Sequence, residues 1–346
     1  MRRLGIVVFS SHTGLGYQSH RLTQFLKPER ILLIDNSTFS KNKDQHPEWY
    51  EGFNGYQVTG FPSRIACLKF LDGLTHLYVI ENPLNWDLIT IAKNKGIKVY
   101  IASNFEFCDN LIHPDLPLPD IFLMPSYWKI EEMKTRFGNN KVIYLPPPIF
   151  PQVFKEARDL NLNRKGKKRF LHIVGTLAAA DRNGTLALLD SLQFSKADYE
   201  LVIKTQHELP KDYVLTDKRI SYQIGSDPSV ENIYKDYDAL IIPRRFGGLC
   251  LPMQEALMSG LAVVMPDISP NSEILKKDWL IPATITGKIR TRTEIDLYES
   301  DIKSLAIKLD DFSKKDLDKD KLDAFEIAMR EFAPSALEER YNDLWK

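Results

Sequence analysis

Short apolar runs alternate with helix-like stretches along most of this chain, and no other feature limits its possible folds as strongly. The run LGIVVF at 4–9 passes through a polar loop with glycines, SSHTGLGYQ, into the helix-like HRLTQFL, which is the order of a βα unit. Strands that alternate with helices usually pair in parallel, so we expect an open parallel α/β sheet in the first half. Four further runs there are typical of buried strands: ILLID (31–35), HLYVIE (76–81), KVYIAS (98–103) and DIFLMPS (120–126).

A proline-rich segment, VIYLPPPIFPQVF, ends this first series and is predicted to be a linker, since proline breaks regular backbone pairing. A chain of 346 residues with 43% hydrophobic residues is long enough to bury two cores. We therefore expect an α/β protein with two Rossmann-like domains, 1–150 and 151–330, that face each other across a cleft. The strands expected in the second domain are FLHIVG (170–175), YELVIK (199–204), RISYQIG (219–225), DALIIP (238–243) and LAVVMP (261–266).

Composition excludes several classes of protein. Lys plus Arg and Asp plus Glu both total 46, so no overall field draws the chain to nucleic acid or to an anionic membrane, although a local basic patch stays open. The three cysteines, Cys67, Cys108 and Cys250, have no paired spacing, so neither a disulfide framework nor a zinc site is expected. The apolar run after Met1 is too short for a signal peptide, and no segment approaches a membrane span. We expect a cytoplasmic protein without stable membrane insertion.

The first loop is a weak phosphate-binding signal. It contains Gly14 and Gly16, but Ser19 stands where a dinucleotide fingerprint has its third glycine. The chain also lacks the P-loop motif, the G-x-S-x-G elbow and the H-E-x-x-H zinc motif. In open α/β sheets, ligands lie at the carboxyl ends of strands, so we expect this loop, the loop after 170–175 and the loop after 238–243 to form the site.

The stretch PRRFGGLCLPMQEALMSG at 243–260 is the most specific of these loops. It predicts a strand end, a loop and then a helix, because Pro252 suits a first helical turn and Gly260 suits a helix end. Glu255 falls within about one turn of the helix start. A carboxylate there is favoured by the helix dipole even without a ligand, so its position alone leaves a structural role open.

The run from Pro243 to Leu275 resembles the donor-binding segment of the large retaining family of GT-B glycosyltransferases, whose pattern PSxxEGFGLPxxEAMAxGxPVVxSxxxxxxEil aligns without a gap. Further pieces follow in order: FLHIVG with RNG at 182–184, ELVIK, ENIYKDYDALIIP and the terminal FAPSALEERYNDLW. The resemblance implies the GT-B fold and a C-terminal helix over 331–346 that crosses back to the first domain. The matching residues are Pro243, Gly248, Leu251, Pro252, Glu255, Ala256, Gly260, Val263, Val264 and Glu273.

The family's E-x7-E pair implies two donor contacts. Its second glutamate holds the ribose hydroxyls and falls on Glu255, while its first contacts the transferred sugar and falls on Gly247. This departure removes a carboxylate and puts the identity of the sugar in question. The backbone N–H groups of Gly247, Gly248 and Leu249 could still bind the sugar or the β-phosphate, because glycines allow close approach.

The family's two diphosphate-binding cations are also replaced. Its Arg, which follows the glycine matched by Gly175, falls on Thr176, and its Lys falls on Asn183. A leaving nucleoside diphosphate gains negative charge in the transition state, so cations are expected from elsewhere. We predict them first at Arg245 and Lys204, then at Arg182 and Arg244.

The acceptor side is less defined. The family often has a His near the sugar, where this chain has ASNFEF at 102–107, so Asn104 or Glu106 is expected to contact donor or acceptor. His12, in the first loop, is the best remaining imidazole, although a single His is more often structural.

The resemblance implies a glycosyltransferase that moves a sugar from a UDP- or GDP-sugar to an acceptor hydroxyl with retention, without a metal or another cofactor. The acceptor is a glycan or a small molecule. One alternative is transfer to a hydroxymethylated pyrimidine in DNA, as in phage-type DNA glycosyltransferases, because the basic run RKGKKR at 164–169 is expected near the cleft. Another is a nucleotide-sugar-binding protein without transfer. The charged run KKDLDKDKLD at 314–323 predicts a solvated helix face rather than a metal site.

Overall fold

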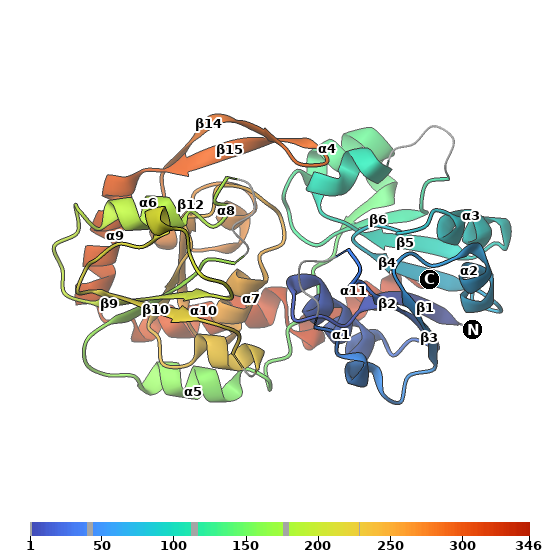
Figure 1. Cartoon of the computed structure of the whole chain (residues 1–346), viewed down its shortest axis with the longest axis horizontal. Coiled ribbons are helices and arrows are strands. Elements are labelled where there is room, and N and C mark those ends of the chain that lie inside the picture. The colour runs from blue at the N-terminus through green and yellow to red at the C-terminus, as the bar shows by residue number, and fades with distance from the viewer. Residues whose placement is uncertain (1, 40–43, 112–116, 176–179, 228) are drawn as a thin grey trace. The chain divides into compact units, whose positions relative to one another are not determined.

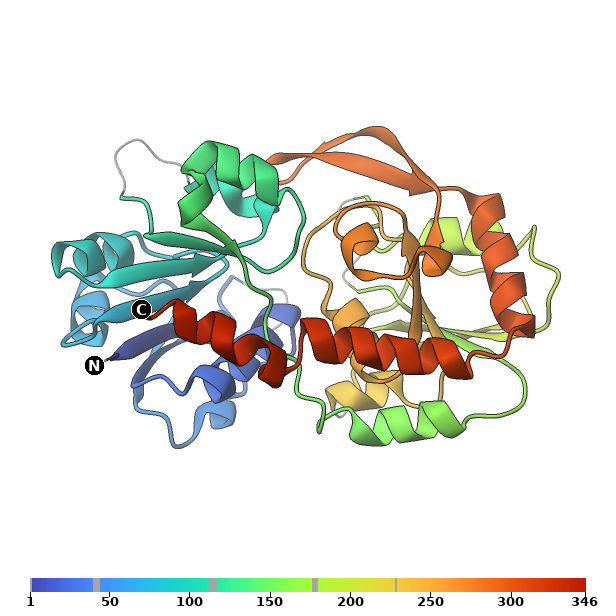
Figure 2. The same ribbon diagram turned by 180° about the vertical axis from the view of Figure 1, so that it is seen from behind.

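The chain is described by a computed structural model over residues 2–39, 44–111, 117–175, 180–227 and 229–346. It divides into two compact units (Figures 1 and 2). The first unit contains Met1–Pro148, Thr291–Thr293 and Leu337–Lys346. The second contains Ile149–Arg290 and Glu294–Ala336. Each unit is built around its own parallel sheet, as expected from the two alternating series.

The first unit has a seven-stranded parallel sheet in the order β3-β2-β1-β4-β5-β6-β7. Five of its strands were expected from apolar runs, and these strands are almost wholly buried. Edge strand β3 was not expected because four of its five residues are exposed. The strands are β1 Leu4–Phe9, β2 Arg30–Asp35, β3 Gly55–Thr59, β4 His76–Ile80, β5 Lys98–Ala102, β6 Ile121–Met124 and β7 Val142–Tyr144.

The helices of this unit connect successive strands. Helix α1 begins where the side chain of Thr13 accepts a hydrogen bond from the N–H of Gly16, which satisfies one of the free donors of the first turn. Gly16 is needed there, because a Cβ would overlap the carbonyl of Ser11. The helical elements are α1 Gly14–Leu26, η1 Pro47–Tyr50, α2 Arg64–Phe70, α3 Asp87–Asn94, η2 Phe105–Leu111, α4 Ile130–Phe137 and η3 Asn139–Lys141.

The C-terminal helix α11 (Pro334–Asp343), the last red helix in Figure 2, supplies part of the first unit's core. Leu337, Tyr341 and Leu344 are buried with residues of β1, β4 and β5. The Tyr341 hydroxyl donates to the carbonyl of Pro146 over 3.1 Å, and the Tyr100 hydroxyl donates to the carbonyl of Leu344 over 2.6 Å. The end of the chain is therefore part of the same hydrophobic core as its beginning.

The second unit has a six-stranded parallel sheet in the order β10-β9-β8-β11-β12-β13. Its first five strands in chain order agree with the apolar runs. An antiparallel hairpin, β14 (Ala283–Arg290) and β15 (Glu294–Ser300), was not expected, because most of its residues are exposed and many are polar. The sheet strands are β8 Arg169–Ile173, β9 Glu200–Thr205, β10 Ile220–Ile224, β11 Ala239–Ile241, β12 Ala262–Pro266 and β13 Leu280–Ile281.

One prediction about the helices of this unit is wrong in part. The charged run at 314–323 does enter a helix, but Asp320 and Lys321 are buried. Lys321 Nζ contacts Asp238 Oδ1 over 2.8 Å, and a buried charge is tolerated when it is paired in this way. The helical elements are α5 Lys155–Asn163, α6 Thr185–Ser191, η4 Lys211–Tyr213, η5 Val230–Tyr234, α7 Leu251–Met258, α8 Asn271–Ile274, η6 Lys277–Trp279, α9 Ile302–Lys314 and α10 Asp318–Glu331.

Candidate functional site

The strand order of each sheet reverses direction at one place. In the second unit the chain moves outward from β8 to β9 and β10, then returns to the other side of β8 with β11. In the first unit the reversal lies between β1 and β4. Ligands of doubly wound sheets bind at such switch points, beyond the carboxyl ends of the strands. The loops after β8 and β11 are therefore the candidate donor site, and the loop after β1 is the candidate site of the first unit.

The turn from β8 into α6 is tightly built. Gly175 and Gly184 both have left-handed backbone, with φ of 67° and 71°. Asp181 accepts hydrogen bonds from the N–H groups of Thr185 and Leu186, over 3.0 and 2.8 Å, and so caps the start of α6. A Cβ on Gly184 would overlap the carbonyl of Pro243, so the start of α6 lies directly against the end of β11.

Asn183, at the position of the family's lysine, acts on the backbone of this turn. Its side-chain amide donates to the carbonyls of Ile173 and Val174, over 2.9 and 3.1 Å. These bonds tie the loop to the end of β8. Thr176, at the position of the family's arginine, lies outside the described residues.

His172 connects β8, β11 and α6 in the interior of the unit. It is fully buried, with Nδ1 at 2.8 Å from the carbonyl of Ile241 and Nε2 at 2.9 Å from Thr185 Oγ1. A carbonyl only accepts, so Nδ1 carries the proton and Nε2 accepts from the Thr185 hydroxyl. Burial lowers the pKa of His172, so this neutral form is the stable one.

Arg244 folds back over its own loop. Its side chain is 6% exposed, with Nε donating to the carbonyl of Phe246 (2.9 Å) and Nη2 to the carbonyl of Leu249 (3.1 Å). Both partners are neutral, and no carboxylate lies within ion-pair distance of Arg244 in the described part of the chain. A buried cation without a counter-ion is costly, so the Arg244 guanidinium has positive charge that is not balanced within the described residues.

Gly247 lies where two guanidinium groups converge. Its φ is 113°, and a Cβ built on it would overlap the guanidinium nitrogens of Arg182 and Arg244. The Arg182 guanidinium also lies 5.3 Å from the centre of the Phe246 ring. The position that carries a carboxylate in the family pattern thus lies beside two positive charges here, and any side chain would displace them.

Arg245 makes a different set of contacts. Its backbone N–H donates to the carbonyl of Arg182 (2.9 Å), and its Nη1 donates to the carbonyl of Ala180 (2.6 Å). Its Nε donates to the carbonyl of Tyr298 (3.2 Å), and Nη2 pairs with Glu299 at 3.1 Å. Arg245 therefore joins the loop after β8 to strand β15, with its charge balanced by a carboxylate.

Lys204, at the end of β9, is also paired. Its Nζ lies 2.9 Å from Asp227 Oδ2 and 3.4 Å from the carbonyl of Asn232. Its side chain is largely buried. A ligand anion would have to share this ammonium group with Asp227.

Glu255 lies on α7, whose residues from Met253 to Met258 are all buried. Its carboxylate accepts a hydrogen bond of 2.5 Å from the hydroxyl of Tyr234 in η5. The α7 start at Leu251 directly follows the loop that holds Gly247, Gly248 and Leu249. A buried carboxylate is thus held on the helix that begins at the end of the candidate donor loop.

His12 belongs to an aromatic cluster in the first unit. Its Nδ1 lies 2.7 Å from the Tyr17 hydroxyl, and its ring centre lies 4.1 Å from that of His46 and 5.2 Å from that of Trp49. Burial, followed by the nearby His46, lowers the pKa of His12, while Asp44 and Glu48 act in the opposite direction. Because its pKa is lowered, the His12 imidazole favours the neutral form. The cluster that contains it follows β1, at the switch point of the first sheet.

The other predicted residues of the first unit follow two strands. Gly14 is exposed at the first position of α1, and Gly16 is buried against Ser11. Asn104 and Glu106 are half-buried at the end of β5 and in η2. Both segments lie at the carboxyl edge of the first sheet. The structure thus places all predicted residues that it describes at the carboxyl edge of one sheet or the other.

Sequence reasoning missed three contributors to these sites: Asp181, Tyr234 and Trp49. Asp181 has only a weak local signal, because it lies four residues before the start of α6, whereas the usual capping residue directly precedes the helix. Tyr234 and Trp49 have no such local signal, because their contacts are with residues distant in the sequence. They became visible only when the elements were packed together.

The basic run at 164–169 lies away from the donor loops. It precedes β8 and so lies at the opposite end of that strand from the loop at 174–184, which differs from the expectation that it is near them. Most of its charges are also paired with carboxylates. Arg164 pairs with Asp238 at 2.8 Å, and Arg169 pairs with Asp236 at 2.7 Å. The run therefore offers little free charge for a nucleic acid backbone.

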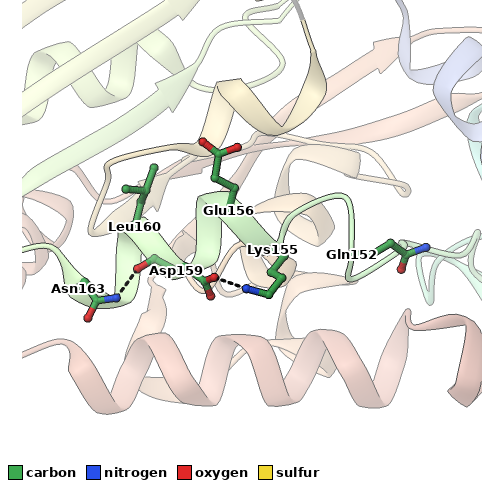
Figure 3. A pocket seen from close by; sticks show the side chains of 6 residues that line it. All are labelled: Gln152, Lys155, Glu156, Asp159, Leu160 and Asn163. Atoms are coloured by element: carbon green, nitrogen blue, oxygen red, sulfur yellow. Dashed lines mark hydrogen bonds and ion pairs between the residues drawn. The ribbon is translucent and has the colours of Figure 1, made fainter.

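A pocket on α5 has no link to the predicted site. It is lined by five polar side chains and one leucine from one helix face and the preceding turn (Figure 3), where Lys155 pairs with Asp159 at 2.5 Å. Its lining residues are Gln152, Lys155, Glu156, Asp159, Leu160 and Asn163.

Within the described ranges, no three His, Cys, Asp or Glu side chains are grouped as they would be around a metal ion. None of the helices in the described part of the chain combines the length and apolarity needed to cross a bilayer.

Comparison with known proteins identifies the fold. No family model matches the chain, and no curated protein matches its sequence. Among solved structures, the Anabaena protein HepE, determined with UDP and glucose, has a TM-score of 0.70 at 9% identity, over 100% of this chain and 99% of that one. A glycosyltransferase from Rickettsia africae has a TM-score of 0.69 at 11% identity, over 100% and 98%. Sucrose-phosphate synthase from Thermosynechococcus elongatus has a TM-score of 0.67 at 12% identity, over 99% and 98%. These likenesses show that the chain has the GT-B fold, with two Rossmann-like domains.

Proposed function

We propose that this protein is a glycosyltransferase that moves a sugar from a nucleoside-diphosphate sugar to an acceptor hydroxyl. The second unit binds the donor, and the first unit binds the acceptor. Solved structures of the same fold include a galactosyltransferase and a glycosyltransferase by name. Another structure of this fold was determined with UDP and glucose. This proposal agrees with the sequence resemblance around Glu255.

The observation that carries the proposal is the buried guanidinium of Arg244 beside Gly247. It is bonded only to neutral carbonyls in the described part of the chain, and the guanidinium of Arg182 lies beside the same glycine. A diphosphate would supply the missing negative charge to Arg244 and would lie beside Arg182. We therefore assign the diphosphate contact first to Arg244, and by its position beside Gly247 to Arg182. Arg245 and Lys204 are less favoured, because their charges are paired with Glu299 and Asp227.

The chemistry follows from these positions. As the bond to the anomeric carbon breaks, charge grows on the leaving diphosphate, and fixed guanidinium groups stabilise it without reorganisation. Glu255 holds the ribose hydroxyls, and the N–H groups of the Gly247 turn contact the phosphate or the sugar. We assign no protein nucleophile among the described residues of the site. We therefore favour retention by front-face attack, with the leaving phosphate accepting the acceptor's proton and no metal taking part.

The test measures donor binding and turnover separately. UDP- and GDP-sugars are screened by the rise in melting temperature that a ligand of the native state must cause, and by release of the nucleoside diphosphate. Arg244→Gln should weaken binding of the matching donor by about tenfold or more, the loss expected for one charged hydrogen-bonding group. Arg169→Gln, which removes a paired arginine at the other end of β8, serves as the matched control.

Two results would contradict the proposal. If no nucleotide sugar raises the melting temperature, the donor site is wrong. If donors bind but none is turned over, even by slow hydrolysis, the protein is a nucleotide-sugar-binding protein without transfer. Transfer to modified DNA is not carried further, because four of the five charges of the basic run at 164–169 are paired with carboxylates.

A further inference from the structure

An ion pair between Lys204 and Asp227 lies at the carboxyl edge of the second sheet, away from Arg244. Arg244 follows β11, whereas Lys204 lies near the end of β9 and Asp227 follows β10, so strand β8 separates them in the sheet order. The charged groups of the pair lie 2.9 Å apart, and the two side chains are 11% and 27% exposed. The pair is therefore mostly withdrawn from solvent at the edge where doubly wound sheets bind their ligands.

The Lys204–Asp227 pair keeps hydrogen-bonding capacity for a further partner. An ammonium group has three donors, and among the described residues Lys204 Nζ meets only two acceptors, Asp227 Oδ2 and the carbonyl of Asn232 at 3.4 Å. Asp227 Oδ1 accepts no hydrogen bond from the part of the chain that the structure describes. A free donor and a free acceptor thus lie side by side. A phosphate would be repelled by Asp227, so a neutral group with both kinds of polar atom suits the pair better.

The pair is connected to Glu255 through the short helix η5. The carbonyl of Asn232 in η5 lies at 3.4 Å from Lys204 Nζ, and the hydroxyl of Tyr234, two residues further on, bonds to Glu255 over 2.5 Å. In a nucleoside diphosphate, the ribose lies between the diphosphate and the base. With the diphosphate at Arg244 and the ribose at Glu255, the base extends toward β9 and β10. This step rests on the proposed function.

We propose that Lys204 and Asp227 recognise the base of the donor and select guanine. One edge of guanine carries a carbonyl oxygen, O6, next to two neighbouring donors, N1–H and the N2 amino group. Lys204 donates to O6, and the two oxygens of Asp227 accept from N1–H and N2, a bidentate contact of the strong, charge-assisted kind. Uracil has a single N–H between two carbonyls. A carboxylate that accepts from this N–H also faces a carbonyl oxygen, which repels it.

The test compares GDP, IDP and UDP by calorimetric titration of the full chain. IDP differs from GDP only in lacking the N2 amino group, so it reports the contact with Asp227. The wild type should bind GDP about tenfold or more tightly than IDP, the effect of one hydrogen bond to a charged group, and GDP should also bind more tightly than UDP. Asp227→Asn should bring the ratio of GDP to IDP affinity close to one, because an amide offers only one acceptor oxygen.

A matched control uses the other end of β10. Asp217, which precedes that strand, is 19% exposed and paired with Arg219 at 2.7 Å, so Asp217→Asn makes the same change away from the site and should leave the ratio unaltered. Melting temperatures of both variants check that they fold.

Equal binding of GDP and IDP by the wild type would overturn the proposal, and so would a ratio that Asp227→Asn leaves unchanged or that both variants change equally. Tighter binding of UDP than of GDP would overturn the choice of guanine while leaving the transferase proposal intact. If none of the three nucleotides binds, the donor site itself is wrong, and the base contact is rejected with it.

Discussion

The Tyr234 hydroxyl donates a hydrogen bond to Oε2 of Glu255 across 2.5 Å, between side chains that are only 1% and 4% exposed. The two residues come from η5 and α7, on either side of strand β11. The bond orients a carboxylate that would otherwise be costly to bury. In the proposed function, this carboxylate receives the ribose of the donor.

Glu255→Gln is expected to weaken nucleotide binding by about tenfold or more while the protein stays folded, because a neutral amide forms weaker hydrogen bonds with hydroxyl groups than a carboxylate does. Calorimetric titration with UDP and GDP measures the change. Glu273→Gln removes an exposed carboxylate of the same segment and should leave binding unaltered. Equal nucleotide affinity in wild type and Glu255→Gln would reject the ribose role.

Gly247→Ala should cost stability and donor affinity together. The backbone φ of 113° is unfavourable for a side chain, and the new methyl group would displace the Arg182 and Arg244 guanidinium groups. We expect a loss of about 1–2 kcal/mol in the free energy of unfolding, the usual cost of such backbone strain. Urea unfolding measures the first effect and donor titration the second. For the same reason, Gly247→Glu, which restores the family residue, should not improve donor binding; a gain in affinity would show that the site tolerates a carboxylate.

Gly184→Ala and Gly96→Ala form a matched pair that separates backbone strain from packing. Both glycines have nearly the same φ, 71° and 70°, but a Cβ on Gly184 would overlap the carbonyl of Pro243, whereas one on Gly96 meets open space. Gly96→Ala should cost about 1 kcal/mol, and Gly184→Ala clearly more. Thermal unfolding compares the two. Similar losses would mean that α6 is not held against the end of β11.

Stability should fall as pH drops through the range where unfolded histidine titrates. Burial lowers the pKa of His172 in the folded state, whereas in the unfolded chain it is about 6.5. The unfolded state therefore binds more protons below about pH 6.5, and folding becomes less favourable by at most about 1.4 kcal/mol per pH unit for this group. Urea unfolding across this range should give a shallower pH dependence for His172→Gln than for the wild type. Identical slopes would exclude this assignment.

Sequence patterns predicted those parts of the fold that depend on local burial. The strands around Val7, Val79 and Val263 are continuous apolar runs, because parallel strands in such sheets are covered on both faces. Edge strand β3 and the β14–β15 hairpin carry no such run, since they are largely exposed. Exposed strands are stabilised by pairing rather than by burial, so hydropathy did not reveal them.

The candidate site, too, could be predicted from the sequence only in part. Gly247 and Glu255 stood out because they lie in one contiguous segment with a recognisable pattern. The pairing of Lys204 with Asp227, and of Lys321 with Asp238, depends on residues brought together from distant segments. Such pairs decide which charges remain available to a ligand, and a linear pattern does not contain that information.

The capping of α6 by Asp181 has a consequence for how the donor is held. Two of the first N–H groups of that helix are already bound to a carboxylate, so a phosphate there would meet negative charge instead of free amides. In the proposed function, the diphosphate is therefore bound by the guanidinium groups of Arg182 and Arg244 rather than by the N–H groups at the start of α6. Ion-pair contacts of this kind weaken as counter-ions screen them, so donor affinity should decline steadily with ionic strength.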